Sequence, residues 1–197
     1  MFSIRGKLVV GLVLALFSTC VLAQTVMKPS WTKEGVDWSQ YNSFLVKPLD
    51  IDDVRMVPPP WAENPDLWEL NIDNLTAVQA IYRDVMRAEL GYPVVYTPGE
   101  GVLELSVEIL SVTPWIRPGK ATDSGMQVTT MGTGELNASV EIRDAKTREL
   151  LLMVAGEKAV GEEYKEFTRV NNVANIEAMF KGFAHRLRAA MDTVHGK

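Results

Sequence analysis

Two segments of this chain alternate strictly between apolar and polar residues, and this alternation constrains the fold more than any other feature. In residues 103–109, leucine, valine and isoleucine alternate with glutamate and serine, and residues 136–142 repeat the pattern. A period of two is typical of strands with one face buried and the other in water. Residues 144–148 have the composition of a hairpin turn, and residues 150–160 return as a third strand. The three strands are predicted to be antiparallel neighbours.

Two segments with helical periodicity accompany these strands. Asp73 is the expected N-cap of a helix that runs to about Leu90, where Gly91 and Pro93 end it. A second apolar stripe covers residues 175–194. In both segments the apolar residues recur every three or four positions, so they share one helix face. The sequence therefore predicts an α+β fold, a two-layer sandwich of a mainly antiparallel sheet with two helices packed on one face.

The remaining segments set the domain organisation. Residues 41–48 form an expected first strand that ends at a proline, and they begin a single α+β domain of residues 41–197. Residues 24–40 lack a clear period and are expected to be an extended lead-in. Two long loops are predicted, over residues 49–70 and 113–134. Loops of this length inside a compact domain are usually either functional or mobile.

The first residues of the chain resemble a secretory signal peptide. Two basic residues precede an apolar run at residues 8–17, and small residues lead to Ala23, immediately before Gln24. The apolar run is too short for a membrane span. We therefore expect a signal peptide over residues 1–23, cleaved between Ala23 and Gln24, and a periplasmic or secreted mature protein.

The only cysteine, Cys20, offers an alternative in which the protein is anchored by a lipid. Bacterial lipoproteins are cleaved before a cysteine that follows a small residue, whereas Thr19 precedes this one. Cleavage after Ala23 fits the small-residue rule better and leaves a mature chain without cysteine. A soluble exported protein is favoured, with an outer-membrane lipoprotein as the alternative. Membrane attachment is expected only through a lipidated Cys20.

Charge excludes one class of partner. The full chain has a formal net charge of −5, and without residues 1–23, which carry two basic and no acidic side chains, the net charge becomes −7. Such a surface repels phosphate backbones, so nucleic acid is not an expected partner. An apolar content of 47% is typical of a packed globule and not of a disordered chain.

Several strand ends resemble those of a family of Gram-negative envelope proteins, many of them lipoproteins, with a DUF3313-like domain of unknown function. The resemblance covers about residues 41–195 and rests on structural motifs. These are the strand of residues 41–48, the Gly-x-Leu-x-Leu strand at 101–109 with Ser-Val-Thr at 111–113, and the segments 140–144 and 146–150. The resemblance implies an exported α+β domain and no catalytic residues. Thr19 departs from the pattern of the lipoprotein members.

Residues suited to catalysis are few. The mature chain has no cysteine and no Gly-x-Ser-x-Gly motif. His185 and His195, the only histidines, are ten residues apart, on different faces of the last predicted helix. Both are expected to be surface residues, and His195 lies near the chain end, where fixed neighbours are not expected. No catalytic residue, metal site or cofactor is predicted.

An exported hydrolase acting on a glycan is the alternative function. Its acid and base would be two of the carboxylates on the polar side of the predicted sheet, drawn from Glu104, Glu108, Glu135 and Glu141. The simpler interpretation of these residues is the solvated side of an antiparallel sheet.

The tryptophans are the strongest remaining indication of function, because all of them fall outside the predicted helices and strands. They are Trp31, Trp38, Trp61, Trp68 and Trp115. The simpler interpretation, which we favour, is that they cover the edges of the core. In a more specific interpretation, an apolar patch for an envelope protein or a glycan is formed by Trp61, Trp68, Trp115 and Ile116. The leading hypothesis is thus a non-catalytic binding or accessory domain of the envelope. The sequence indicates neither the ligand nor the oligomeric state.

Overall fold

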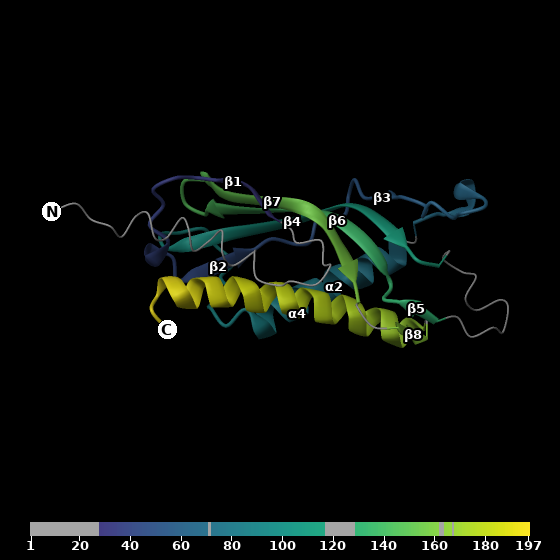
Figure 1. The fold of residues 1–197 in the computed structure, drawn as a ribbon. Helices are drawn as coiled ribbons and strands as arrows, with labels where there is room; N and C mark the ends of the chain where they lie inside the picture. The colour runs from purple at the N-terminus through teal and green to yellow at the C-terminus, as the bar shows by residue number, and fades with distance from the viewer. Residues whose placement is uncertain (1–27, 71, 117–128, 162–163, 167) are drawn as a thin grey trace.

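The computed structural model describes residues 28–70, 72–116, 129–161, 164–166 and 168–197. The expected signal peptide, its cleavage site Ala23–Gln24 and Cys20 lie outside the described residues. Figure 1 shows a sheet lying over two long helices, which confirms the predicted α+β two-layer sandwich. The elements are β1 (Lys28–Thr32), η1 (Trp38–Gln40), β2 (Ser43–Val46), β3 (Arg55–Met56), η2 (Pro65–Leu67), α2 (Ile72–Glu89), β4 (Val102–Pro114), β5 (Thr129–Met131), β6 (Gly134–Asp144), β7 (Leu150–Val160), β8 (Tyr164–Glu166) and α4 (Arg169–Val194).

The main sheet has six strands in the order β1-β7-β6-β4-β2, and β3 also pairs with β4. The pairs β4–β6, β6–β7 and β1–β7 are antiparallel, which confirms the predicted meander of three neighbouring strands. The short strands β2 and β3 both run parallel to β4, one beside each half of it. A separate two-stranded sheet pairs β5 with β8. The long strand β4 therefore organises the sheet and carries β3 at its far end.

Alternation along the central strands places their apolar side chains toward the helices. Leu103 and Leu105 of β4 are completely buried, and Val140 of β6 and Leu152 of β7 are nearly so. The register sets Leu105 opposite Ile142, so the apolar residues of neighbouring strands share one face. The prediction of one buried face is confirmed for these strands.

The opposite face of the sheet differs from the prediction at Glu104 and at Ser139, which is only 9% exposed. Glu104 was expected in water, yet its residue is only 2% exposed. Its carboxylate forms an ion pair with Arg148, which lies after the turn between β6 and β7. The guanidinium folds back over the strand, and this partner allows a carboxylate to be buried there.

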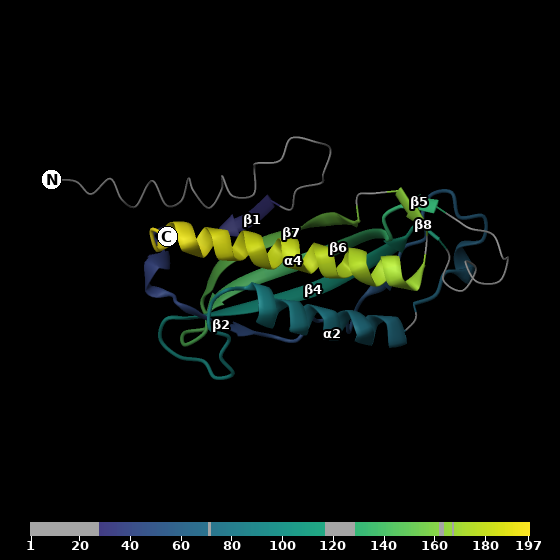
Figure 2. The ribbon, with the colours of Figure 1, turned by 90° about the horizontal axis from the view of Figure 1, so that it is seen from below.

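Both helices pack on the same face of the sheet, as predicted. Figure 2 shows α2 and α4 side by side along the strands, and the two helices contact each other. Within the described part of the chain, none of the helices has the length and apolar character needed to cross a membrane.

The two helices begin earlier than predicted. Helix α2 starts at Ile72, so Asp73 is not its N-cap but lies in its first turn, where a carboxylate still interacts favourably with the helix dipole. Helix α4 starts at Arg169, and the hydroxyl of its N-cap Thr168 accepts the backbone N–H of Asn171. The prediction of a start at 175 was wrong because the first turns of α4 bury no apolar stripe.

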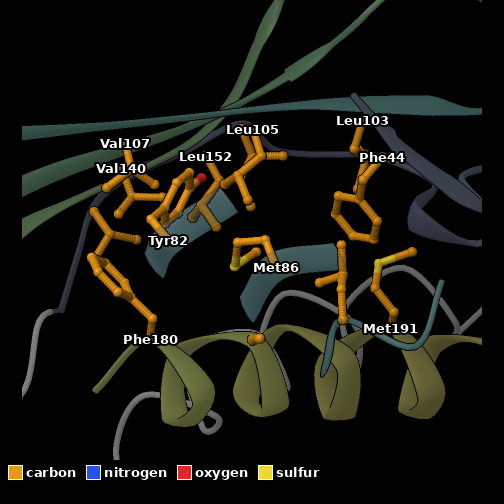
Figure 3. Close-up of a cluster of buried hydrophobic side chains, with 14 of the residues drawn as sticks. Phe44, Tyr82, Met86, Leu103, Leu105, Val107, Val140, Leu152, Phe180 and Met191 are labelled. Carbon is orange, nitrogen blue, oxygen red and sulfur yellow. The ribbon is translucent and has the colours of Figure 1, made fainter. Parts of the chain in front are cut away.

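The core lies between the sheet and the helices. Figure 3 shows side chains of both helices meeting those of the strands, and the rings of Tyr82 on α2 and Phe180 on α4 meet edge to face with centroids 5.2 Å apart. Met86 and Phe44 are completely buried beside them. The hydroxyl of Tyr82 is buried without a hydrogen-bond partner among the described residues. It is an unsatisfied polar group in an otherwise apolar core.

The described part of the expected lead-in, residues 28–40, belongs to the folded unit. Lys28–Thr32 forms the edge strand β1, with a register shift between Pro29 and Trp31, and Trp38 in η1 is buried against Tyr41. The prediction that all tryptophans lie outside regular elements was therefore wrong for Trp31 and Trp38. The covering role predicted for tryptophan is confirmed for Trp38.

The chain end is held in place, contrary to the prediction for His195. Its Nε2 atom lies 2.8 Å from the carbonyl oxygen of Tyr41, and its ring packs beside that of Tyr92. The Tyr92 hydroxyl donates to Asp192 at 2.8 Å. His185 is exposed, as predicted, and its Nε2 atom lies 2.9 Å from Oε2 of Glu89 on α2. The His195 contact therefore ties the end of α4 to the start of the domain, and the other two contacts tie α4 to α2 and to the segment that follows it.

Candidate binding surface

The loop between β3 and α2 is positioned by β4. The N–H of Val57 donates to the carbonyl of Val112 at 2.9 Å and extends the β3–β4 pairing by one residue. A turn follows, in which the N–H of Ala62 donates to the carbonyl of Pro59, also at 2.9 Å, and Pro59 is buried. Proline fixes the backbone angle of each residue in the Pro58–Pro60 run, which limits the conformations open to the loop. The loop is therefore held at both the strand and the turn.

This loop places Trp61 against Trp115, which directly follows β4. The two indole rings are stacked, with centroids 5.4 Å apart and planes 21° from parallel. The N–H of Trp115 donates to the carbonyl of Thr133 at 3.2 Å, so its backbone is tied to the segment that leads into β6. Trp115 is half-buried, whereas Trp61 remains 59% exposed. One face of the Trp61 ring is thus covered and the rest meets solvent.

Two aliphatic side chains of the same loop are also exposed. They are Val57, directly after β3, and Leu67, the last residue of η2. We name the set Val57, Trp61, Leu67 and Trp115 the tryptophan surface. An exposed aromatic anchor with aliphatic neighbours is typical of the centre of protein interfaces.

The predicted site residues fall into two groups. Trp61 and Trp115 are brought together, and Ile116, half-buried, follows Trp115 along the chain. Trp68 is half-buried at the C-cap of η2. Trp31 lies elsewhere, on the edge strand β1 opposite Met153, and is 44% exposed.

The sequence interpretation did not include Val57 and Leu67. The available signal was weak, because each is a single apolar residue in a loop rich in proline and carboxylates.

The exposed apolar residues are concentrated at one end of the molecule. The described large hydrophobic side chains that are exposed include Val57, Trp61 and Leu67, and also Val170 and Val173 on the first turns of α4. Figure 1 shows the loop after β3 and the start of α4 at the same end, opposite the C-terminus. Several exposed apolar side chains toward one end of a molecule are uncommon on a surface that meets only water.

Three carboxylates follow Trp61 within the sequence of the loop. Glu63, Asp66 and Glu69 are all exposed, and Arg55 on β3 is the basic residue of the same segment. Within the described part of the chain, these three acidic side chains form no ion pair. The loop therefore presents apolar rings with a negative rim.

Two of the four carboxylates proposed for the alternative hydrolase are held by arginine side chains. Glu104 is paired with Arg148, and Glu141 accepts two hydrogen bonds from the Arg143 guanidinium, at 2.8 and 3.0 Å. A general acid has to donate a proton, whereas these two carboxylates act as acceptors toward a permanent cation. Among the described residues there is also no group of three or more histidine, aspartate or glutamate side chains able to hold a metal ion.

Comparison with known protein families matches residues 22–187 to the family described as a protein of unknown function, DUF3313. No curated protein matches the sequence. Similar solved structures include two crystal forms of the PelC dodecamer from Paraburkholderia phytofirmans. One, a substituted variant, is 11% identical with a TM-score of 0.40 and covers 83% of this chain and 97% of that chain. The other is 10% identical with a TM-score of 0.39 and covers 82% and 98%.

A third similar structure is protein XCC0632 from Xanthomonas campestris, of family DUF330. It is 8% identical with a TM-score of 0.38 and covers 82% of this chain and 87% of that chain. At these identities the likeness concerns the fold alone. The family match spans most of the sequence and agrees with the resemblance noted in its strand ends, so the chain belongs to the DUF3313 family of proteins of unknown function.

Proposed function

We propose that this protein is an exported, non-catalytic binding protein of the bacterial envelope, and that it contacts a partner protein through the tryptophan surface. Export is supported by the basic start, the short apolar run and the small residues before Gln24. The main observation behind the binding role is that Trp61 is exposed although its ring is already held in a stack with Trp115.

Exposure of this indole has an energetic consequence. A partner that covers the open part of one tryptophan removes on the order of 100 Å² of apolar surface from water, which is worth about 2–3 kcal/mol. The stack with Trp115 orders the ring before binding, so little side-chain entropy is lost when a partner arrives. Pre-ordered aromatic anchors are the residues that dominate many protein interfaces.

Aliphatic neighbours favour a protein partner over a glycan. Val57 and Leu67, in the same loop as Trp61, offer exposed branched apolar groups. Sugars stack on aromatic faces but present hydroxyl groups at their edges, and exposed aliphatic side chains cannot bond to these. An apolar side chain of another protein can fill the same space.

Site-specific photo-crosslinking in the native organism tests the proposal. A photoreactive amino acid is introduced at Leu67 and, as a matched control, at Tyr96, an aromatic residue that is 75% exposed outside the tryptophan surface. We expect a discrete crosslinked protein from position 67 and none of the same mass from position 96. Trp61→Ala should reduce that crosslink at least fivefold. No crosslink at position 67, or the same product from both positions, would overturn the proposal.

A further inference from the structure

We propose that the tryptophan surface recognises a segment of the partner protein that bears lysine or arginine, with a cation seated on the free face of Trp61. This inference rests on the binding function proposed above and names the chemistry of the partner. The ring of Trp61 is stacked on Trp115 on one side only, and it is 59% exposed. Tryptophan is the aromatic side chain that attracts a cation over its face most strongly.

Two other aromatic rings show that this chain uses such contacts internally. The guanidinium of Arg87 lies 5.6 Å from the ring centroid of Tyr96, and the ammonium of Lys197 lies 5.1 Å from that of Tyr92. In contrast, no cation of the described residues lies over Trp61. Trp61 is the most exposed tryptophan of the described residues, so its ring is the one most open to a cation from a partner.

The charges around the ring favour the same ligand. Elsewhere on the surface, several exposed basic side chains pair with carboxylates of this chain, as in the ion pairs Lys33–Glu149, Lys146–Glu100 and Lys181–Glu177. Glu63, Asp66 and Glu69 have no such partner within the described residues, and only Arg55 offsets them in this segment. The negative rim attracts a basic segment and repels anionic lipid headgroups. A neutral glycan would gain nothing from it.

Peptide binding to the purified mature protein, residues 24–197, tests this inference. The probes are an array of 12-residue peptides, each with three arginines or lysines among apolar residues, and matched peptides with glutamine at the basic positions. Affinity is measured by fluorescence anisotropy at 50 and 300 mM NaCl. We expect basic peptides to bind at least tenfold more tightly than their glutamine counterparts and to weaken in high salt.

Variants separate the two parts of the proposed contact. Trp61→Ala and the triple variant Glu63→Gln, Asp66→Asn, Glu69→Gln should each weaken peptide binding at least fivefold, and Tyr96→Ala should leave it unchanged. Equal binding of glutamine peptides, or no binding by any basic peptide, would overturn the inference. Preferential binding to anionic vesicles or to chitin oligosaccharides would do so as well.

The crosslink at position 67 distinguishes the two proposals. If Trp61→Ala removes that crosslink but the triple charge variant keeps it, the partner protein binds without basic recognition. In that case the binding function stands and the present inference fails. Loss of the crosslink in both variants supports both.

Discussion

Tyr41 donates its hydroxyl hydrogen to Oδ2 of Asp144, 2.9 Å away, and this bond ties the segment before β2 to the turn between β6 and β7. The other oxygen of the same carboxylate accepts the backbone N–H groups of Lys146 and Thr147, at 2.9 and 2.8 Å. Burial by itself raises the pKa of Asp144, but the hydrogen bonds from Thr147, Tyr41 and Lys146 outweigh it and hold the pKa below its ordinary value of 3.8. One carboxylate therefore closes the hairpin and anchors the start of the domain.

Removing the charge of Asp144 is expected to destabilise the protein near neutral pH and not in acid. Asp144→Asn should lower the free energy of unfolding by about 1–3 kcal/mol at pH 7, because hydrogen bonds to a carboxylate are stronger than those to an amide. A lowered pKa means that this contribution is complete above the ordinary value of 3.8 and disappears as the pH falls through the folded-state pKa. The difference in the free energy of unfolding between wild type and variant, measured by urea unfolding, should be smaller at pH 3 than at pH 7. A constant difference would contradict this account.

The buried hydroxyl of Tyr82 predicts a stabilising substitution. Burial raises the pKa of Tyr82, so the group stays protonated with a donor that finds no partner among the described residues. Tyr82→Phe keeps the ring contact with Phe180 and should raise the free energy of unfolding by about 1 kcal/mol. Tyr92→Phe is the matched control, since it removes the bond to Asp192 and should cost about 1 kcal/mol. Thermal unfolding of both variants checks the opposite signs, and a lower Tm for Tyr82→Phe would refute the assignment.

Arg148 combines an ion pair to a buried carboxylate with an unfavourable backbone, which makes its alanine and glycine variants informative together. Its φ of 65° lies in the left-handed region, while its side chain holds Glu104. Arg148→Ala leaves a buried carboxylate without its cation and should cost about 2–3 kcal/mol. Arg148→Gly loses the same pair but relieves the backbone, so it should be about 1 kcal/mol more stable than the alanine variant. Chemical denaturation that finds alanine equal to or better than glycine would exclude backbone strain at this position.

Local sequence patterns predicted the elements whose apolar residues repeat regularly within one segment. The alternation in β4, β6 and β7 directly reports which side chains face the core, so these strands were assigned with their pairing. Strand β1 was missed because it is a short edge strand in which a register shift between Pro29 and Trp31 breaks the period of two. The parallel placement of β2 and β3 beside β4 depends on tertiary packing, and no pattern within these short segments indicates it.

The candidate site was also predictable only in part, because tertiary packing brings its residues together. The tryptophan content of the loops indicated an apolar surface, and Trp61 and Trp115 were named for it. Their stacking joins a loop to a strand end far away in the sequence, and it follows from the pairing of β3 with β4. The burial of Glu104 was not predictable because it depends on a guanidinium across the hairpin, outside the alternating pattern of its own strand.

Gly132, next to the tryptophan surface, approaches the backbone of Val160 and Gly161 closely, and this contact gives a test of the fold at that end of the molecule. A Cβ atom on Gly132 would lie 2.4 Å from the carbonyl oxygens of both Val160 and Gly161, and the φ of Gly132 is +78°. Gly35 has a similar φ of +73° but nothing within 4 Å of its Cβ position. Gly35→Ala should therefore cost about 1 kcal/mol through the backbone alone. Gly132→Ala should cost at least about 3 kcal/mol, because backbone carbonyls cannot move aside as a flexible side chain can. The loss in the free energy of unfolding is measured for both variants by urea unfolding. Equal losses would mean that the backbone segments around Gly132 are further apart than the structure has them. If Gly132→Ala does not fold while Gly35→Ala does, the close approach is supported.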